Sequence, residues 1–340
     1  MQRGGRIVHA NVIGGRVMQL GQREPFVEWH VGVAVLGAGM MGAGIAYVQA
    51  MAGIESVLID QTQEAAEKGK GYAEALVKKA VSRGKMTAEK GEKILALITP
   101  TTDYALVAGS DLVVEAVFEN REVKADVTKK AEAQLADTAI FGSNTSTLPI
   151  TGLAEASVRP ANFIGIHFFS PVDRMGLVEI IKGEKTSDQT IAAAIDYVMK
   201  IKKTPIVVND SRGFYTSRCF STYVAEGMEM LAEGIAPAII DNVGRATGMP
   251  RGPLEMNDDV ALDLSYKIGE QTKKDLGDKY EERPFAPVLE KMVVEMGRLG
   301  RKNGKGFYDY PESGAKRIWP GLADLMPVTT KDADPALIEE

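Results

Sequence analysis

The stretch VGVAVLGAGMMG, residues 31–42, decides the fold, and its pattern continues to residue 60. Val31–Leu36 is a short apolar run, which predicts a buried strand of a parallel sheet. Gly37–Gly42 predicts a turn, Ala43–Ala52 a helix and Ser56–Ile59 a second buried strand. This order of strand, turn, helix and strand predicts one β-α-β unit of about 30 residues.

Three glycines of the turn, Gly37, Gly39 and Gly42, match the G-x-G-x-x-G pattern of dinucleotide-binding loops. Gly37 allows the tight turn, Gly39 lets the backbone approach a pyrophosphate, and Gly42 lets the helix pack closely on the strand. Asp60 follows the second strand, where a carboxylate accepts hydrogen bonds from ribose hydroxyls and repels the 2′-phosphate of NADP. We therefore expect NAD as the cofactor. The alternative is a turn with chance glycines and an exposed acid at a strand end.

Beyond residue 60, strand and helix patterns alternate to about residue 210. This alternation predicts a Rossmann-like, doubly wound and mostly parallel α/β sheet. A long charged helical pair, broken near Arg83-Gly84, is expected over Thr62–Ile98. Further strands are expected at 111–118, 139–143, 162–168, 178–182 and 205–208, with helices at 121–135 and 188–201.

After Arg212 the strand patterns stop, and helices are expected at 215–233, 237–247, 254–269 and 287–297. We therefore predict an α/β domain followed by an all-α domain, in four regions. These are an unpatterned tail or short edge hairpin (1–30), the NAD-binding domain with a helical insert at 62–98 (31–212), the all-α domain (213–310) and a linker-like tail (311–340).

The composition excludes several classes of protein. The chain has 340 residues, of which 45% are apolar, so it can bury a sizeable core and is long enough for two domains. One cysteine cannot form an internal disulfide or a cysteine-based metal site, and no metal site is expected. The net charge of −6 disfavours a general nucleic-acid binder, and no apolar run is long enough to span a membrane. We expect a cytoplasmic protein.

His167 is the only histidine of three that lies inside the α/β pattern, at the end of an expected strand. Open α/β sheets bind ligands at such strand ends, and imidazole has the intrinsic pKa needed to take a hydroxyl proton near neutral pH. Glu179 lies within the apolar run Leu177–Ile181, where a carboxylate needs a partner. An imidazole in a neighbouring strand would supply one. The alternative is a satisfied core histidine and an outward-facing glutamate.

Polar residues 143–147, SNTST, end another apolar strand at the same edge of the expected sheet. They offer hydroxyl and amide donors to a ligand. The alternative interpretation is a polar turn between a strand and a loop.

Several segments together carry a resemblance to a known family. They are residues 35–42, 113–120 (VVEAVFEN), 143–146, 167–171 (HFFSP), 213–214 and 300–308 (GRKNGKGFY). Over about residues 31–327 the chain resembles the (3S)-3-hydroxyacyl-CoA dehydrogenases of fatty-acid β-oxidation. It is most similar to the dehydrogenase part of the bacterial multifunctional fatty-oxidation complex α subunits.

The resemblance implies catalytic roles for three residues. His167 would be the general base that takes the proton of the 3-hydroxyl group. Glu179 would orient the imidazole and stabilise the imidazolium. Ser146 would donate a hydrogen bond to the reacting oxygen.

The resemblance also implies binding roles. Met41, Asp60, Glu119 and Lys124 would line the NAD site. The helical insert would help hold the coenzyme A moiety of an acyl-CoA substrate, and its eight Lys and Arg against five Glu suit a phosphate-bearing ligand. The alternative for the insert is a solvated charged helix face.

Two positions depart from the family pattern, because Ser170 and Ser217 stand where the family usually has asparagine. Both positions normally face the substrate or the nicotinamide, so rate and chain-length preference are expected to differ. The first 30 residues do not resemble the hydratase domain of multifunctional chains, and residues 318–322 resemble the linker before their second helical domain. The chain is therefore a stand-alone enzyme or a fragment of a longer one.

Three functional hypotheses follow. The first is a 3-hydroxyacyl-CoA dehydrogenase, and the second is a related hydroxyacid or sugar-acid dehydrogenase of the same fold. The third is a non-catalytic NAD-binding or structural protein, since fold does not determine function. With one helical domain instead of two, the apolar helical segments 223–231 and 288–296 need another surface to cover them, so we expect a homodimer through this domain.

Overall fold

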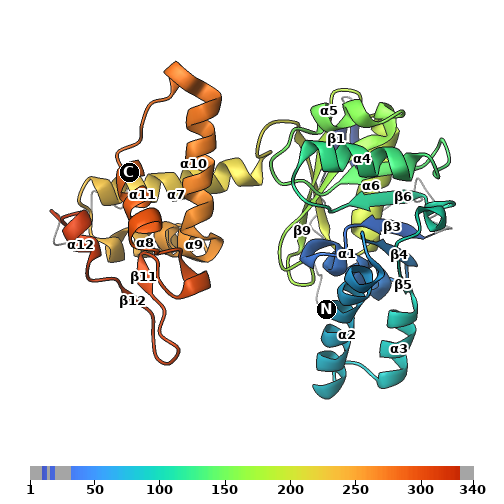
Figure 1. The fold of residues 1–340 in the computed structure, drawn as a ribbon, viewed down its shortest axis with the longest axis horizontal. Helices are drawn as coiled ribbons and strands as arrows, with labels where there is room; N and C mark the ends of the chain where they lie inside the picture. Colours follow the sequence, from blue (N-terminus) through green and yellow to red (C-terminus); the bar gives the residue numbers. More distant parts are fainter. Residues whose placement is uncertain (1–9, 14–15, 20–31, 330–340) are drawn as a thin grey trace, which may run out of the picture. The chain divides into compact units, whose positions relative to one another are not determined.

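The computed structural model of the chain describes residues 10–13, 16–19 and 32–329. The chain divides into two compact units, residues 1–217 and 218–340 (Figure 1). In the described ranges, no helix is both long and apolar enough to cross a membrane.

Unit 1 is built on an eight-stranded sheet with the order β10-β9-β8-β7-β6-β3-β4-β5. Every neighbouring pair is parallel except β8 and β9, which run antiparallel. The predicted doubly wound, mostly parallel α/β fold is confirmed. The strands are β3 Val33–Leu36, β4 Ser56–Ile59, β5 Ile98–Thr101, β6 Leu112–Glu115, β7 Ile140–Ser143, β8 Phe163–Phe168, β9 Leu177–Lys182 and β10 Thr204–Asn209.

Helices cover both faces of this sheet, because its central strands are apolar on both sides. In β3, Val33 and Val35 belong to one core cluster, and Ala34 and Leu36 belong to the other. The first cluster is completed by α1 Met40–Met51, α2 Gln63–Ser82 and α6 Asp188–Lys200. The second is completed by α4 Arg121–Glu132 and α5 Ile150–Leu153.

The insert expected over residues 62–98 is a helical pair that ends in a strand (Figure 1). Thr62 caps α2 by accepting from the amide of Ala65 at 3.1 Å, and Thr87 caps α3, Ala88–Ala96, by accepting from the amide of Lys90 at 3.3 Å. The sequence pattern missed β5, an edge strand whose sequence ITPT buries only Ile98. A proline and two threonines hide a strand from a hydrophobicity pattern, but an edge strand tolerates them.

Part of the expected N-terminal tail forms a hairpin. Strands β1 (Ala10–Ile13) and β2 (Arg16–Gln19) pair antiparallel, separately from the eight-stranded sheet. The rest of residues 1–30, Val31 of the predicted first strand, and residues 330–340 lie outside the described residues.

The helical character predicted for unit 2 is confirmed, but over its described residues, 218–329, it is not all-α, because it also holds a small two-stranded sheet. The expected helix 254–269 is two helices, because Ala261 adopts φ 106° and interrupts the hydrogen-bonded ladder. The expected helix 287–297 is a short α-helix followed by one π-helical turn, Lys291–Glu295. The elements are α7 Thr216–Ala232, which begins in unit 1, α8 Pro237–Ala246, α9 Pro253–Val260, α10 Leu262–Leu276, α11 Ala286–Glu290, β11 Tyr308–Asp309, β12 Arg317–Ile318 and α12 Leu322–Leu325.

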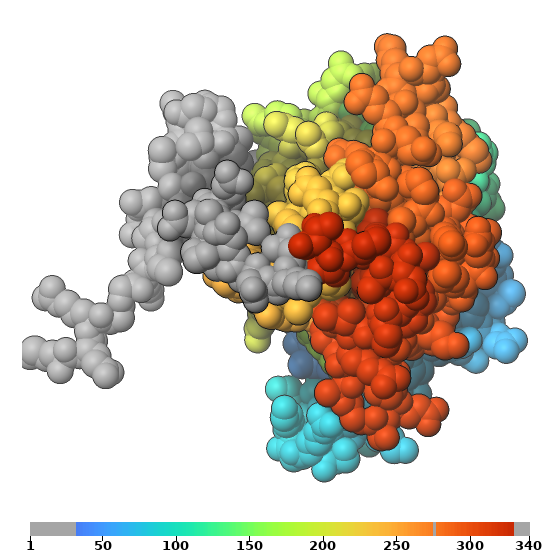
Figure 2. Space-filling view, turned by 90° about the vertical axis from the view of Figure 1, so that its left-hand side faces the viewer, coloured from blue at the N-terminus to red at the C-terminus, as the bar shows by residue number. Residues whose placement is uncertain are grey.

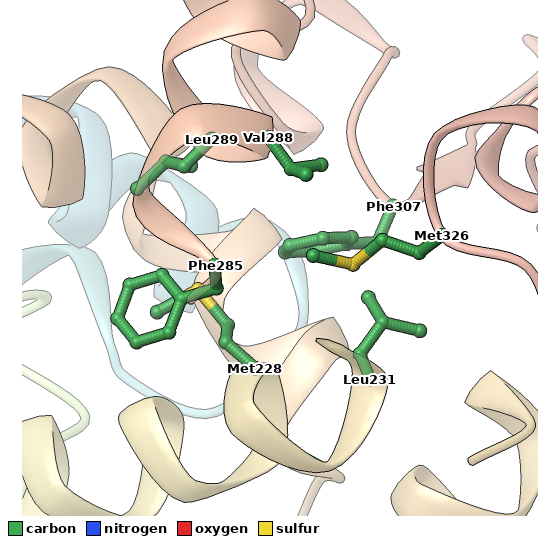
Figure 3. A pocket seen from close by; sticks show the side chains of 7 residues that line it. All are labelled: Met228, Leu231, Phe285, Val288, Leu289, Phe307 and Met326. Atoms are coloured by element: carbon green, nitrogen blue, oxygen red, sulfur yellow. The ribbon is translucent and has the colours of Figure 1, made fainter. Parts of the chain in front are cut away.

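The segment after residue 310, expected to be loop-like, contributes to the core of unit 2. Leu322 and Met326 are buried in the same cluster as Met228, Leu231 and Phe307. Figure 3 shows Met326 beside Phe307, facing the apolar side chains of α7 and α11. Figure 2 shows the segment, in red, lying on the orange helices of its own unit.

Candidate active site

The glycine-rich loop between β3 and α1 has the geometry that each glycine requires. Gly37 has φ 94°, and a Cβ there would lie 2.6 Å from the carbonyl oxygen of Ala116. A Cβ on Gly42 would lie 1.7 Å from the carbonyl oxygen of Gly37, so only glycine lets the helix pack this closely. A Cβ on Gly39 would meet nothing within 4 Å, so the space above the loop is open. This is the space that a pyrophosphate needs.

The loop lies where the direction of strand order changes, because β3 has β4 on one side and β6 on the other. Ligands of open α/β sheets bind at such a point. Gly39 begins α1 without a side-chain cap, which leaves helix amides available to an anion. Asp60 Oδ2 accepts from the amide of Ala38 at 2.7 Å and is thereby held against the loop, and Met41 lies half-buried in the first turn of α1. These residues fit an NAD cofactor.

We expect NAD to be preferred over NADP, and Asp60→Ala to narrow that preference. The substitution removes the carboxylate that accepts from ribose hydroxyls and repels a 2′-phosphate. The measurement is kcat/KM with each cofactor, for the wild type and the variant. Equal kcat/KM values for NAD and NADP in the wild type would contradict the assignment.

His167 and Glu179 lie directly opposite each other in the antiparallel pair of β8 and β9. His167 Nδ1 is 2.7 Å from Glu179 Oε2, and the two residues are 7% and 0% exposed. The rings of Phe169 and Phe214 lie 4.5 Å and 5.9 Å from the imidazole. Glu179, a carboxylate in an apolar run that needed a partner, therefore forms a hydrogen-bonded pair with His167.

Glu179 has three further donors, all at the beginning of α7. Its Oε1 accepts from the amides of Tyr215 at 3.1 Å and Thr216 at 2.8 Å, and its Oε2 accepts from the Thr216 hydroxyl at 2.8 Å. Burial alone would raise the pKa of Glu179, but the hydrogen bonds from His167 and Thr216 outweigh it and hold the pKa below its ordinary value. An ionised carboxylate only accepts, so His167 donates from Nδ1, and in the neutral imidazole the free electron pair is then on Nε2.

Ser146 lies exposed in the turn that follows β7. Glu119 Oε1 accepts from the Thr145 hydroxyl at 2.5 Å, the Ser146 amide at 3.2 Å and the Thr147 amide at 3.3 Å. Asn144 Oδ1 accepts from the amide of Phe168 at 2.8 Å, which ties the turn to the residue after His167. The structure thus brings the Ser146 turn and the end of β8 together.

Glu119 faces this turn, whereas Lys124 lies beneath it. Lys124 is 3% exposed, and its Nζ is 2.8 Å from Glu115 Oε1 and 3.2 Å from Glu119 Oε2. Glu115 and Thr216 carried no predicted role, whereas Asn144 and Thr145 were expected only as donors to a ligand and not as parts of a network that holds the turn. Glu115 lies within an apolar run, as Glu179 does, and this pattern is the sequence signal for its buried carboxylate.

The two serines that depart from the family pattern lie on different elements. Ser170 is exposed in the loop after β8, and its Oγ is 3.8 Å from Met40 Sδ at the start of α1. Ser217 is half-buried in the first turn of α7, directly after Thr216, which contacts Glu179. Within the described part of the chain, no group of three His, Cys, Asp or Glu side chains is arranged to hold a metal ion.

Two family models match the chain. The NAD-binding domain of 3-hydroxyacyl-CoA dehydrogenase matches residues 32–211, and the C-terminal domain of the same enzyme matches residues 213–310.

Among curated proteins, the chain is 41% identical over 305 residues to the fatty acid oxidation complex subunit alpha of Shewanella amazonensis, covering 88% of this chain and 43% of that protein. It is 42% identical over 306 residues to the same subunit of Idiomarina loihiensis, covering 90% of this chain and 41% of that protein. The chain thus spans less than half the length of these relatives.

Among solved structures, the chain is similar to the (S)-3-hydroxybutyryl-CoA dehydrogenase of Ralstonia eutropha. The TM-score is 0.76 at 34% identity, covering 83% of this chain and 99% of that chain. The 3-hydroxybutyryl-CoA dehydrogenase of Escherichia coli gives a TM-score of 0.77 at 33% identity, covering 84% of this chain and 61% of that chain.

Proposed function

Since the chain belongs to the 3-hydroxyacyl-CoA dehydrogenase family, and its first unit is that family's NAD-binding domain, we propose that it oxidises (3S)-3-hydroxyacyl-CoA to 3-oxoacyl-CoA. We propose fatty-acid β-oxidation as its role, as in the fatty acid oxidation complex subunits that it resembles. The observation that carries the proposal is the His167–Glu179 pair, because His167 stands at the carboxyl end of β8 and the nucleotide loop follows the carboxyl end of β3.

His167 is the general base of this proposal. Glu179 accepts from Nδ1, so Nε2 takes the proton of the 3-hydroxyl group, and the adjacent carboxylate stabilises the imidazolium that forms. The glycine-rich loop would hold NAD⁺, which would supply the acceptor for the hydride that leaves C3 of the substrate. Ser146 donates to the substrate oxygen, and Ser170 and Ser217 are further substrate contacts. Gly37, Gly39, Met41, Gly42, Asp60 and Glu119 hold the cofactor, with Lys124 acting through Glu119.

The coenzyme A moiety separates this function from a related hydroxyacid or sugar-acid dehydrogenase. We propose that the insert over residues 62–98, which comprises α2, α3 and the turn between them, helps to bind it through its eight Lys and Arg against five Glu. The test is NADH oxidation with acetoacetyl-CoA beside free acetoacetate. We expect a kcat/KM at least a hundredfold higher for acetoacetyl-CoA. A comparable kcat/KM for both would favour the hydroxyacid alternative, and no turnover of either would favour a non-catalytic protein.

We also propose a cytoplasmic homodimer that forms through unit 2. The segments 223–231 and 288–296, expected to need a second surface, are largely covered within unit 2, where Met228, Leu231, Leu289 and Met292 are buried. The supporting observation is instead that Leu264 and Ile268 on α10 and Val294 after α11 are exposed by 45%, 48% and 60%. Exposed apolar side chains on neighbouring helices favour burial by a second copy. Sedimentation at micromolar concentration should give a dimer, and Ile268→Glu should shift it toward monomer. A well-folded monomer of the wild type would overturn the dimer.

A further inference from the structure

A buried chain of charged and polar side chains runs beneath the turn that carries Ser146. Glu115, at the end of β6, is 1% exposed, and its Oε1 accepts from Lys124 Nζ at 2.8 Å and from the amide of Val117 at 2.8 Å. Its Oε2 accepts from the Ser143 hydroxyl at 2.7 Å, at the end of β7. Since Glu115 and Ser143 are paired in register, this carboxylate ties the ends of two strands together.

Lys124 links Glu115 to Glu119. It stands in the first turn of α4 between two carboxylates, with Nζ 2.8 Å from Glu115 Oε1 and 3.2 Å from Glu119 Oε2. Glu115 and Lys124 are almost fully buried, whereas the Glu119 side chain is 35% exposed. The Glu115–Lys124 pair therefore lies in the core, and Glu119 is the member that reaches the site.

We propose that Glu115 and Lys124 are positioning residues that hold the Ser146 turn in place through Glu119, an inference that rests on the proposed function. The two oxygens of Glu119 have different partners. Oε2 is held by Lys124, and Oε1 accepts from the Thr145 hydroxyl and from the amides of Ser146 and Thr147. The Thr147 hydroxyl also donates to Oε1, at 3.3 Å. A carboxylate held on one side by a buried cation thus holds four donors of the turn on the other.

The electrostatics support this arrangement. Burial alone would raise the pKa of Glu119, but the charge of Lys124 and the hydrogen bonds from Thr145 and Ser146 hold the pKa below its ordinary value. Glu119 therefore stays ionised and accepts from the turn throughout the neutral range. Without Lys124 it would be free to turn toward water, and a displacement of about 1 Å at a catalytic group costs roughly a hundredfold in rate.

The test is the double variant Glu115→Gln/Lys124→Met. Lys124→Met alone leaves the buried Glu115 carboxylate without a cation, and Glu115→Gln alone leaves buried Lys124 with only the partly exposed Glu119. The double variant removes both buried charges and keeps the volumes. The side-chain oxygen of the introduced glutamine can still accept a hydrogen bond at the end of β6. We expect unfolding by urea to stay close to that of the wild type and NADH binding to weaken, because Lys124 acts on the cofactor through Glu119. At saturating NADH, kcat with acetoacetyl-CoA should fall ten- to a hundredfold, with a smaller change in the KM for acetoacetyl-CoA.

Glu132→Gln is the matched control. Glu132 is a buried carboxylate two turns further along α4, and it accepts from the Ser157 hydroxyl at 2.5 Å and the Val158 amide at 2.8 Å, away from the Ser146 turn. Its loss should lower stability and leave kcat unchanged. A Glu119→Gln variant, alone and combined with the double variant, should give the same kcat, because all three substitutions act through one contact.

Hydrogen exchange tests the inference without using activity. Amides of residues 144–148 should exchange at least tenfold faster in the double variant than in the wild type or in Glu132→Gln. The inference would be overturned if the double variant kept its exchange rates and kcat within twofold of wild type. It would also be overturned if the losses in kcat of the double variant and of Glu119→Gln added when the substitutions were combined. If the wild type does not turn over acetoacetyl-CoA, the proposed function fails, and the exchange experiment still decides whether the pair holds the turn.

Discussion

Replacing His167 by Gln should lower kcat with acetoacetyl-CoA by roughly 10²–10⁴, the usual contribution of general acid–base catalysis. Glutamine can still donate to Glu179 from its amide, but it has no basic nitrogen in place of Nε2. In the direction of NADH oxidation, the same loss removes the acid that protonates the oxygen formed from the ketone. The effect should appear in kcat more than in KM, because proton transfer occurs only in the chemical step.

Two measurements separate this outcome from a folding defect. NADH binding, followed by fluorescence, should be unchanged, because the glycine-rich loop lies on β3 and α1 and not on β8. His9→Gln is the control substitution, since His9 lies outside the α/β pattern of the sequence. Turnover of His167→Gln within a few-fold of wild type would remove His167 as the base.

Glu179→Gln should have the second large effect, on rate and on stability together. The carboxylate accepts from His167, from two backbone amides and from the Thr216 hydroxyl, all at 2.7–3.1 Å. The glutamine amide that replaces it has one oxygen and one NH₂ group. Since both oxygens of Glu179 accept from donors, the NH₂ group must point at a group that also donates. When the NH₂ group of the glutamine faces His167, Nδ1 must accept and therefore carries the free electron pair. Nε2, which should take the proton of the substrate, then carries a hydrogen instead. Loss of the correct tautomer costs roughly 10²–10⁴ in kcat.

The stability effect of Glu179→Gln has a defined pH dependence. The pKa of Glu179 is lowered in the folded state, so its carboxylate contributes stability above the ordinary glutamate pKa of 4.5. This contribution is lost as the pH falls through the lower folded-state pKa. The free energy of unfolding should therefore differ between wild type and variant by about 1–3 kcal/mol near pH 7, with the difference shrinking in acid.

Urea unfolding from pH 7 down to pH 3, with kcat measured at pH 7, checks both parts. Glu184→Gln is the matched control, because Glu184 is an exposed carboxylate just after β9 and should change neither quantity. A full loss of rate with no loss of stability would mean that Glu179 orients the histidine without anchoring the start of α7. A pH-independent stability difference would contradict its ionised state.

Much of this fold is local in origin and could be predicted from the sequence. The glycine-rich turn needs a positive φ at Gly37 and no side chain at Gly42, and both requirements are visible as glycines in the sequence. Buried strands appear as apolar runs, because each side chain of β3 packs against helices on one face or the other. The α/β fold, the helical second unit and the family all followed from such short patterns.

The errors fall where tertiary context overrides local pattern. Strand β5 contains Pro100, which an edge position tolerates but a hydrophobicity pattern rejects. The break at Ala261 needs φ 106°, a conformation that alanine does not favour and that only surrounding packing maintains. The segment from residue 311 onward looks like a linker because prolines and glycines at 311, 314, 320, 321 and 327 interrupt it, yet Leu322 and Met326 are buried in the core of unit 2.

By itself the sequence determined the β-α-β nucleotide loop, the carboxylate at Asp60 and the presence of one histidine and one glutamate in consecutive strand patterns. Only the tertiary structure decided which side chains meet. His167 faces Glu179 because β8 and β9 run antiparallel in this register, and Glu115 reaches Ser143 because β6 and β7 run parallel in theirs. A one-residue slip in either pairing would turn these side chains to opposite faces of the sheet. The register of two strands depends on contacts between residues that are distant along the chain, so a local sequence pattern does not predict it.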